Sequence, residues 1–331
     1  MNQCLHPLDI VIAWVDGNDI TLKNKRRQFM SQNEPSNALD KTRFASNDEI
    51  YFCIASILKF VPYAGTIYIV TDQQIPLWLD QFEQQGLCTA GKIKIVDHQD
   101  LFHDYESALP TFNSLSIESM LWNINGISNH FIYLNDDFFF NQHSDLSDFL
   151  IDEQMVVYGH WETAFIKKMK YIFRKFLQLN FGKVAKAKYS TAQMLSADRL
   201  GMTRYYEIHH RPHIISRDLL GTFFKNNKDL LEQQIHFRFR NIDQLLPVGL
   251  SNHLAVQCNQ AILKDDIEIA YLKDGRDLEK FILALSNSEI KFGCIQSLDQ
   301  LESFAEGRIR TRLIQKFKEF LPSQIQATIV V

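Results

Sequence analysis

Two adjacent acids, Asp136 and Asp137, stand in a stretch that is otherwise mostly apolar. This stretch covers residues 131–140 and reads Phe-Ile-Tyr-Leu-Asn-Asp-Asp-Phe-Phe-Phe. Its short aromatic and β-branched runs are typical of a buried strand. Two unpaired carboxylates near a core are costly, and a divalent cation that also binds a phosphate would offset that cost. The alternative is that Asn135 and Asp136 only cap a turn after the strand.

Three earlier apolar runs also predict buried strands with polar ends. They cover residues 9–15, 66–71 and 93–98. The first leads into the turn Asp16-Gly17-Asn18-Asp19, which is rich in hydrogen-bond acceptors. Because open α/β sheets bind ligands at the carboxyl ends of their strands, Asp16 or Asp19 is a candidate contact to a metal, a sugar or a nucleotide. The alternative for Asp16 and Gly17 is a simple turn.

Helical patterns separate these strands. Ser46 and Glu49 have the spacing of a capping box, which predicts a helix that stops near Pro62. A short helix is expected to begin at 76–79, and another to cover 112–122 before the central strand. The alternation predicts an α/β fold with a Rossmann-like, mostly parallel sheet flanked by helices.

Composition excludes several classes of protein. The chain has 331 residues, 46% of them hydrophobic, which is enough to bury a sizeable core. Its net charge of −4 argues against a surface that coats nucleic acid. Five scattered cysteines without a CxxC motif argue against a disulfide framework or a structural zinc site, and favour a reducing compartment. No apolar run approaches about 18 residues and no signal peptide is evident, so we expect a cytoplasmic protein, soluble or peripheral on the inner face of the plasma membrane.

Two segments are basic and amphipathic. Between residues 161 and 188 eight cations accompany one acid, with apolar residues at near-helical spacing. Residues 308–321 show a similar pattern. Each predicts either a surface helix whose apolar face packs on the protein, or a helix that docks on an anionic membrane surface.

Several ordered segments together resemble the Stealth proteins. The first conserved region is matched by residues 9–19, and the third by His210-Arg-Pro212-His213 followed by Arg240. The second region resembles segments that contain Arg43-Phe44, Asn47-Asp48-Glu49, residues 68–72, Pro76-Leu-Trp78, residues 96–98, residues 109–114, Ile117-Glu118-Ser119 and residues 133–137.

This resemblance implies a function. Stealth proteins include bacterial capsule and cell-wall polysaccharide phosphotransferases and the lysosomal-enzyme N-acetylglucosamine-1-phosphotransferase. Similarity to them implies transfer of a sugar 1-phosphate from a nucleotide diphosphate sugar onto a hydroxyl, on a GT-A-like fold with a divalent metal. A UDP-sugar donor would release UMP, and the acceptor would be a lipid-linked or polymeric glycan.

The chemistry assigns roles to particular residues. Asp136 and Asp137 are expected to hold Mg²⁺ or Mn²⁺, and Asp137 is counted with His210 and Arg240 as catalytic. His210 is the expected base, because imidazole titrates near neutral pH, with His209 and His213 as alternatives. Arg240 is expected to stabilise phosphate charge. The expected substrate contacts are Asp16, Gly17, Asp19, Arg43, Asp48, Asn113, Ser114 and Glu118. Purely structural roles are the alternatives: Asn113 and Ser114 could cap a helix, Glu118 could form a buried salt bridge or cap, and Arg43 could pair with Asp48.

The fourth Stealth region departs from the family pattern. That region usually carries an Asn-Asp pair after a cysteine, whereas Cys294 is followed here by Ile-Gln296-Ser297. Because the acid is absent, we expect no role there beyond a contact with the donor.

We expect one catalytic domain over residues 1–331. Its nucleotide-sugar-binding half would cover 1–150, a basic helical insertion 161–190, the rest of the core 200–300, and a C-terminal amphipathic helix 301–331. Two other functions are compatible with the sequence. One is a metal-dependent glycosyltransferase that releases UDP, and the other is a degenerate protein that binds polysaccharide or membrane without turnover.

Overall fold

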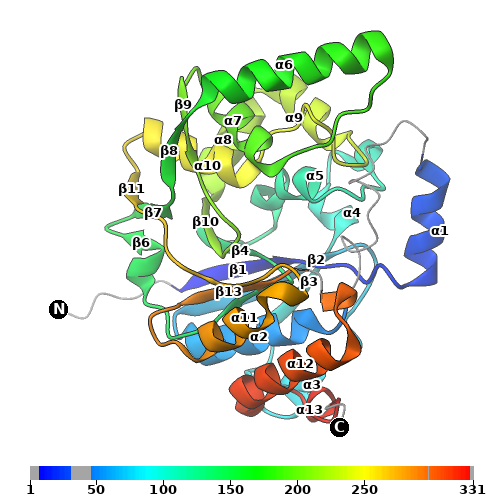
Figure 1. Ribbon diagram of the computed structural model, residues 1–331, viewed down its shortest axis with the longest axis vertical. Helices are drawn as coiled ribbons and strands as arrows, with labels where there is room; N and C mark the ends of the chain where they lie inside the picture. Colours follow the sequence, from blue (N-terminus) through cyan, green and yellow to red (C-terminus); the bar gives the residue numbers. More distant parts are fainter. Residues whose placement is uncertain (1–6, 31–45, 297, 329–331) are drawn as a thin grey trace.

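The computed structural model describes residues 7–30, 46–296 and 298–328 (Figure 1). Its central sheet has five strands in the order β10-β4-β1-β2-β3. The parallel strands are β1 (Leu8–Ala13), β2 (Ala64–Thr71), β3 (Ile93–Asp97) and β4 (His130–Asn135). Only the edge strand β10 (His213–Ser216) runs antiparallel to its neighbour β4 in this sheet. The predicted mostly parallel α/β sheet is therefore confirmed.

The central strands are apolar along their whole length because both faces of the sheet are covered. Ile10, Val11 and Ile12 are consecutive in β1 and all are fully buried, although their side chains alternate between the two faces. Figure 1 shows α2 (Glu49–Phe60), α11 (Leu278–Ser286) and α12 (Ser303–Phe317) on one side of the sheet. On the other side lie α5 (Ser114–Glu118), α8 (Arg217–Asn226) and α10 (Pro247–Gln257).

A small sheet adjoins the acidic pair. It has the order β12-β13-β5, and β5 (Phe138–Phe140) begins directly after Asp137. β12 (Ala270–Leu272) and β13 (Phe292–Ile295) come from much later in the chain. A Cβ at Gly293 would lie 2.1 Å from the ring of Phe139, so glycine is required for this close approach. The acidic turn is thus held between two sheets.

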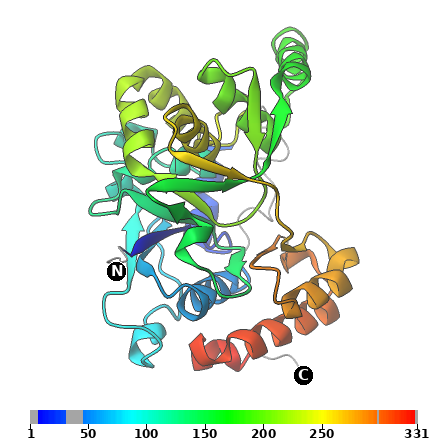
Figure 2. The same ribbon diagram turned by 90° about the vertical axis from the view of Figure 1, so that its left-hand side faces the viewer.

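The other elements complete the upper part of the molecule and its periphery (Figures 1 and 2). Two smaller sheets contain β11 (Ala261–Lys264), β7 (Gln154–Tyr158) and β6 (Leu150–Ile151), and β8 (His160–Thr163) with β9 (Arg204–Glu207). The remaining α-helices of the described residues are α1 (Ile20–Phe29), α3 (Gln81–Gln84), α4 (His98–Leu101), α6 (Ala164–Phe181), α7 (Tyr189–Arg199), α9 (Lys228–Ile235) and α13 (Ser323–Gln326).

The predicted capping box is wrong. Ser46 does not cap α2, because its hydroxyl accepts a hydrogen bond from Trp14 Nε1 at 3.2 Å. Glu49 Oε2 instead accepts from the backbone N–H of Asn47 at 2.5 Å. Asp48, with φ of 69°, precedes the first residue of the helix. Asp48 is therefore the N-cap residue of α2, and its side chain makes no capping hydrogen bond.

Two predicted helices have different bounds in the structure. A turn closed by the Leu79 N–H and the Pro76 carbonyl (3.0 Å) occupies the expected start at 76–79, so α3 begins only at Gln81. The helix expected over 112–122 is split into α5 and a 3-10 turn, Leu121–Asn123. Ser119 contributes to that break, because its hydroxyl donates to the Leu115 carbonyl at 2.7 Å and competes with helical bonding.

Candidate active site

The Asp136–Asp137 pair lies at the turn between β4 and β5, where it lines a cavity of about 640 Å³. Burial raises the pKa of Asp136 well above its usual range, and the charges of Asp137 and Glu49 raise it further. Burial also raises the pKa of Asp137 to about 6, against the opposing effect of a hydrogen bond from Cys294. Both carboxylates are therefore held in surroundings that disfavour their charge.

Glu49 is a third carboxylate of this group, and the sequence reading missed it. It is 8% exposed at the start of α2 and lines the same cavity. Burial raises its pKa to about 7, and the nearby charge of Asp137 acts in the same direction. Its spacing from Ser46 suggested a local cap, although it belongs to the segment Asn47-Asp48-Glu49, which resembles the same Stealth region as residues 133–137.

Of these carboxylates, Asp136 and Asp137 fit a divalent cation. Asp137 Oδ1 is buried without a hydrogen-bond partner, and Oδ2 accepts from the weak donor Cys294 Sγ at 3.6 Å. Oxygen ligands of this kind suit Mg²⁺ or Mn²⁺. A cation would also favour the ionised carboxylates that burial otherwise opposes.

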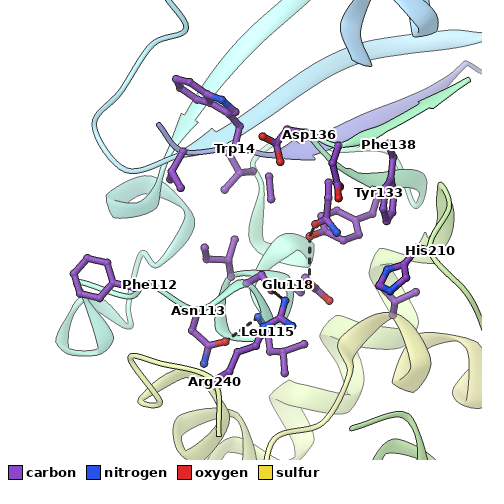
Figure 3. A pocket seen from close by; sticks show the side chains of 18 of the residues that line it. Trp14, Phe112, Asn113, Leu115, Glu118, Tyr133, Asp136, Phe138, His210 and Arg240 are labelled. Atoms are coloured by element: carbon purple, nitrogen blue, oxygen red, sulfur yellow. Dashed lines mark hydrogen bonds between the residues drawn. The ribbon is translucent and has the colours of Figure 1, made fainter. Parts of the chain in front are cut away.

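The opposite wall of the cavity carries Arg240 and Glu118 (Figure 3). Arg240 Nη2 donates to the Ser114 hydroxyl at 2.6 Å. Glu118 is 4% exposed, and burial raises its pKa to about 7 although the charge of Arg240 lowers it. Tyr133 donates to Asn135 Oδ1 at 2.8 Å and lies 3.4 Å from Glu118 Oε1. Since Glu118 Oε2 has no partner, this wall offers both a cation and an unsatisfied acceptor.

His210 lies in the cavity between aromatic rings. Its ring stacks on Tyr189 at 4.9 Å between centroids and on Tyr271 at 6.2 Å, and Phe138 meets it edge-on. Burial lowers the pKa of His210, and the charges of Arg240 and His209 add to that effect. The neutral imidazole, which can accept a proton, is therefore favoured.

The neighbouring histidines differ from His210. His213 also lines the cavity but is 5% exposed in β10, and burial lowers its pKa well below the usual value. His209 does not line the cavity and approaches Asp266 instead. Of the three, His210 alone combines access to the cavity with a position on a loop rather than in a strand.

The cavity wall also carries aromatic and polar side chains, among them Trp14, Phe112, His98 and Asp72. Asp72 pairs with Lys25 at 2.7 Å. Both ring nitrogens of His98 are buried without a hydrogen-bond partner, and burial lowers its pKa to about 4. These groups could accept a flat, polar ring.

Several predicted substrate contacts do not line the cavity. Asp16 accepts from the Asn18 N–H at 2.8 Å, and Asp19 caps α1 by accepting from the Leu22 N–H at 2.7 Å. They and Gly17 follow Ala13, Trp14 and Val15, which do line it. Asp48 pairs with Arg310 at 2.8 Å, and Arg43 lies outside the described residues.

Asn113 lines the cavity, but its polar atoms serve the fold. Its Oδ1 caps α5, and its amide donates to Phe237 O and to Gln244 Oε1, both at 2.8 Å. These bonds tie α5 to the loop that bears Arg240. A supporting role is thus evident, as the capping alternative predicted.

Cys294 lies beside the acidic pair. Besides its thiol contact with Asp137, the backbone N–H of Ile295 donates to the Asp137 carbonyl at 2.8 Å. Gln296 lines the cavity and accepts from the Tyr271 hydroxyl at 2.6 Å. An amide therefore stands near the place where the family pattern led us to expect an acid.

The chain is similar in sequence to several known proteins. Residues 43–157 match the family described as Stealth protein CR2, conserved region 2. The chain carries a Stealth region. An exopolysaccharide phosphotransferase of Streptomyces coelicolor is 29% identical over 267 residues, which is 80% of this chain and 42% of that protein. A capsular polysaccharide phosphotransferase of Haemophilus influenzae is 41% identical over 136 residues, or 40% of this chain and 35% of that protein.

The chain spans half or less of the length of these curated relatives. Among solved structures, it is similar to the galactosyltransferase LgtC in complex with donor and acceptor sugar analogs, with 12% identity and a TM-score of 0.43 over 98% of this chain and 97% of that one. Mouse xyloside xylosyltransferase 1 has 9% identity and a TM-score of 0.39, over 88% and 99%. The fold class rests on the sheet order itself rather than on these distant similarities.

Proposed function

We propose that this Stealth chain transfers a hexose or N-acetylhexosamine 1-phosphate from a UDP-sugar to a hydroxyl of a glycan acceptor. The products would be a phosphodiester and UMP, in the synthesis of a capsule or cell-wall polysaccharide. The observation that carries this proposal is the half-buried acidic pair facing Arg240 and His210 across one cavity. The polysaccharide phosphotransferases among its relatives support the same reaction.

The reaction needs few parts from the protein. An acceptor oxygen attacks the phosphorus that bears the sugar, a new P–O bond forms, and the bond to UMP breaks. His210 takes the proton of the attacking hydroxyl, for which its neutral ring is suited. Arg240, held by Ser114, stabilises negative charge on the phosphate oxygens. The anomeric C–O bond stays intact, so the sugar keeps its configuration.

Asp136 and Asp137 would hold a divalent cation, Mg²⁺ or Mn²⁺, with Glu49 close by. Such an ion neutralises the charge of a diphosphate. Asp137 belongs to the catalytic group with His210 and Arg240 in this proposal. Glu118 and Ser114 would contact the donor or acceptor sugar from the opposite wall.

The polarity of the cavity suggests how the donor lies. The uracil ring would occupy the end with Trp14, Phe112 and His98, and the diphosphate would reach the acidic end. Asp16, Gly17 and Asp19 follow the strand that lines the base end, so they would meet the nucleotide only at its rim. Arg43 and Asp48 stay predicted contacts of the nucleotide.

Product analysis tests the proposal directly. The chain is incubated with a panel of UDP-sugars, Mg²⁺ or Mn²⁺ and a glycan acceptor, and the released nucleotide and the linkage are identified. We expect UMP and a phosphodiester, and Asp137→Asn should lower turnover by about a thousandfold, a loss of the size that follows removal of a transition-state charge contact. Asp104→Asn, at an exposed acid away from the cavity, is the control. Release of UDP would instead indicate a glycosyltransferase, and no turnover with any donor would favour a degenerate binding protein.

The reaction would take place at a membrane surface, because α6 exposes its apolar face and turns its polar face towards the protein. A surface helix normally turns its apolar stripe towards the core. In α6 the stripe that faces the body is largely polar: Lys167 pairs with Glu207 at 2.6 Å, and Lys175 with Asp243 at 2.9 Å. The large apolar side chains face outward with exposed fractions of 48–75%, namely Phe165, Ile166, Met169, Ile172, Phe173, Phe176 and Leu179.

The charge around this apolar stripe favours an anionic bilayer as its partner. No acid occurs between residues 163 and 197, whereas the same interval carries eight cations. Anionic lipid headgroups attract such cations while the apolar stripe enters the interface. The segment after α6 leads to Ala187 and Tyr189, which line the cavity. Docking through α6 would therefore bring the site near a lipid-linked acceptor.

Within the part of the chain that the structure describes, no helix meets the length and hydropathy needed to cross a bilayer. Surface docking is tested by co-sedimentation with vesicles of phosphatidylcholine containing anionic phosphatidylglycerol. We expect binding that weakens as salt rises and is absent on vesicles of phosphatidylcholine alone. Equal binding to both vesicles, or none to either, would contradict the proposal.

A further inference from the structure

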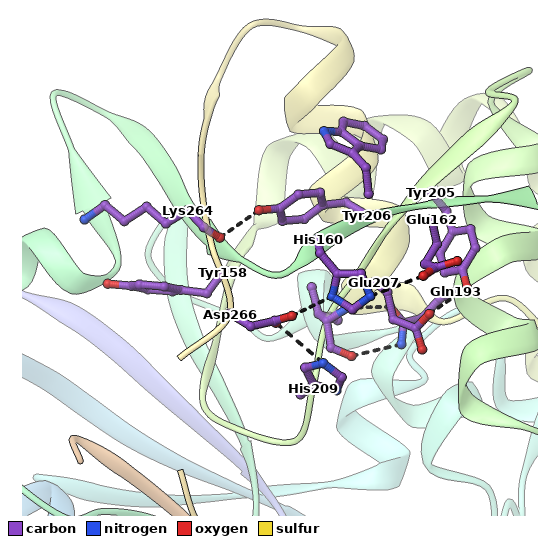
Figure 4. Close-up of polar contacts among 12 residues, drawn as sticks. Tyr158, His160, Glu162, Gln193, Tyr205, Tyr206, Glu207, His209, Lys264 and Asp266 are labelled. Carbon is purple, nitrogen blue, oxygen red and sulfur yellow. Dashed lines mark hydrogen bonds and ion pairs between the residues drawn. The ribbon is translucent and has the colours of Figure 1, made fainter. Parts of the chain in front are cut away.

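Three side chains outside the active-site cavity converge on one point of the surface (Figure 4). His160 Nδ1 lies 2.5 Å from Asp266 Oδ2, and His209 Nε2 lies 3.5 Å from Asp266 Oδ1. The two imidazole rings are 5.8 Å apart between centroids. Across residues 7–30, 46–296 and 298–328, no other three His, Cys, Asp or Glu side chains meet the same closeness of ligand atoms.

We propose that His160, His209 and Asp266 bind one Zn²⁺ ion. Two imidazole nitrogens and one carboxylate form a donor set that suits zinc and other late transition metals, whereas Mg²⁺ prefers oxygen alone. One ligand atom from each residue lies within 4.8 Å of the others, so a single ion could reach all three after small side-chain rotations. All three side chains are partly exposed, so an ion can enter and water can complete its coordination.

A second carboxylate lies beside one ligand. His160 Nε2 faces Glu162 Oε1 at 3.6 Å, on the side of the ring away from Asp266. Metal-bound histidines commonly direct their second nitrogen to a carboxylate, which fixes the tautomer and the orientation of the ring. Glu162 is thus a positioning residue. The alternative, a surface hydrogen-bond network, does not require this second carboxylate on the same imidazole.

The backbone also brings the ligands together. His160 begins β8, which pairs with β9, and a Cβ at the preceding Gly159 would lie 2.2 Å from the carbonyl oxygen of Glu207. His209 follows β9, and Asp266 follows β11. The ion would therefore join three segments of the chain. His160 and His209 are 49 positions apart, and His209 and Asp266 are 57 positions apart.

This site differs from the acidic pair in chemistry and in place. The scattered cysteines of the sequence argued against a structural zinc site built from cysteine. The ligands proposed here are histidine and aspartate instead. His209 is adjacent to His210, whose ring lies in the active-site cavity. If the proposed transfer takes place, the bound ion would steady the loop that carries its base. The zinc proposal itself does not rest on that activity, because binding is measured without substrate.

Titration calorimetry tests the site. The protein is stripped with EDTA, desalted, and titrated with ZnCl₂ in excess Mg²⁺, which occupies the oxygen site. We expect one Zn²⁺ per chain, and at least about tenfold weaker binding after His209→Ala or Asp266→Asn. His143→Ala is the matched control, because His143 lies 3.7 Å from Asp145 without a second imidazole. Thermal unfolding in EDTA checks that every variant is folded.

A second measurement needs no variant. Co²⁺ added to the stripped wild-type protein should give the intense visible absorption of a tetrahedral site, and Zn²⁺ should remove it by displacement. Absence of that band together with absence of Zn²⁺ binding would overturn the proposal. Zinc binding that is equally tight in wild type, His209→Ala and Asp266→Asn would overturn it as well, since the ion would then lie elsewhere.

Discussion

The helices α6 and α12 have similar patterns of basic and apolar residues, but they pack on the protein with opposite faces. Both are basic and amphipathic, and the sequence allowed either to pack on the body or to dock on a membrane. In α12 the apolar stripe is buried, with Ile309, Leu313 and Phe317 at 0% exposure. In α6 only Ala164 is buried, and the apolar stripe faces outward. Amphipathicity therefore predicts that a helix has two faces, but not which face the protein covers.

Contacts with other elements explain the difference. Phe317 of α12 meets Phe60 of α2 and Phe139 of β5, with ring centroids 6.1 and 6.2 Å apart. α6 meets the body mainly through ion pairs and a small cluster around Met194 and Tyr205. Buried apolar contact holds α12, so removing it should unfold the protein. Removing the outward stripe of α6 should change binding instead.

The largest contrast is expected in stability. Phe317→Ala should lower the free energy of unfolding by about 3–5 kcal/mol, because a fully buried ring leaves a cavity. Phe173→Ala, at 60% exposure in α6, should change it by about 0.5 kcal/mol or less. Urea unfolding of both variants measures the difference. Equal losses would show that the α6 stripe is covered in solution.

The second contrast concerns vesicle binding. Replacing Phe173 and Phe176 of α6 with serine should weaken binding to anionic vesicles more than about tenfold, since each aromatic side chain contributes about 1.5–3 kcal/mol on full burial. Phe304→Ser is the matched control, because Phe304 is 77% exposed but belongs to α12. Co-sedimentation checks both. A similar loss for Phe304→Ser would assign docking to the whole surface rather than to α6.

The charges of α6 should have a smaller effect. Lys170→Gln in α6 and Lys183→Gln in the segment directly after it should each weaken vesicle binding roughly fivefold, because a cation near an anionic surface is worth about 1 kcal/mol. These residues are exposed, unlike Lys167 and Lys175, which are committed to ion pairs. Arg312→Gln in α12 should leave binding unchanged. The fivefold effect should fade as salt rises, and an effect that persists at high salt would exclude an electrostatic cause.

The smallest effect is a pH dependence from α12. Burial lowers the pKa of Lys316 to about 8, and the charge of Lys59 lowers it further. The folded protein therefore loses this proton before the unfolded chain does, so stability should rise between pH 8 and about 10.5. Lys316→Met should remove about 1 kcal/mol of that rise, a figure reduced because water screens the partly exposed ammonium. Urea unfolding at pH 8 and pH 10 measures it, and identical pH slopes would contradict the prediction.

Much of the sheet could be predicted from the sequence. Buried parallel strands are apolar on both faces, so residues 9–15, 66–71 and 131–134 stood out as short continuous runs. Helix bounds were harder, as the split at Ser119 shows. There a side-chain hydroxyl bonds to the backbone, and the local hydrophobic pattern contains no sign of that bond.

Part of the candidate site was also predictable. The structure brings Asp136, Asp137, Glu118, His210 and Arg240 to one cavity, as the sequence interpretation expected. Glu49 and Tyr189 were missed, because their nearest sequence neighbours suggest only a helix start and an ordinary aromatic residue. Asp48 pairs with Arg310, 262 positions away, and no local pattern indicated that partner.

The sequence by itself determined the four parallel strands of the central sheet, where the acids follow a strand, and which helices have an apolar stripe. These properties repeat over a few residues, so they are visible in the order of side chains. Only the tertiary structure decided that α12 buries its stripe while α6 exposes it, and that His210 enters the cavity while His209 turns to Asp266. Such choices depend on contacts between residues far apart in the chain, which no local pattern records.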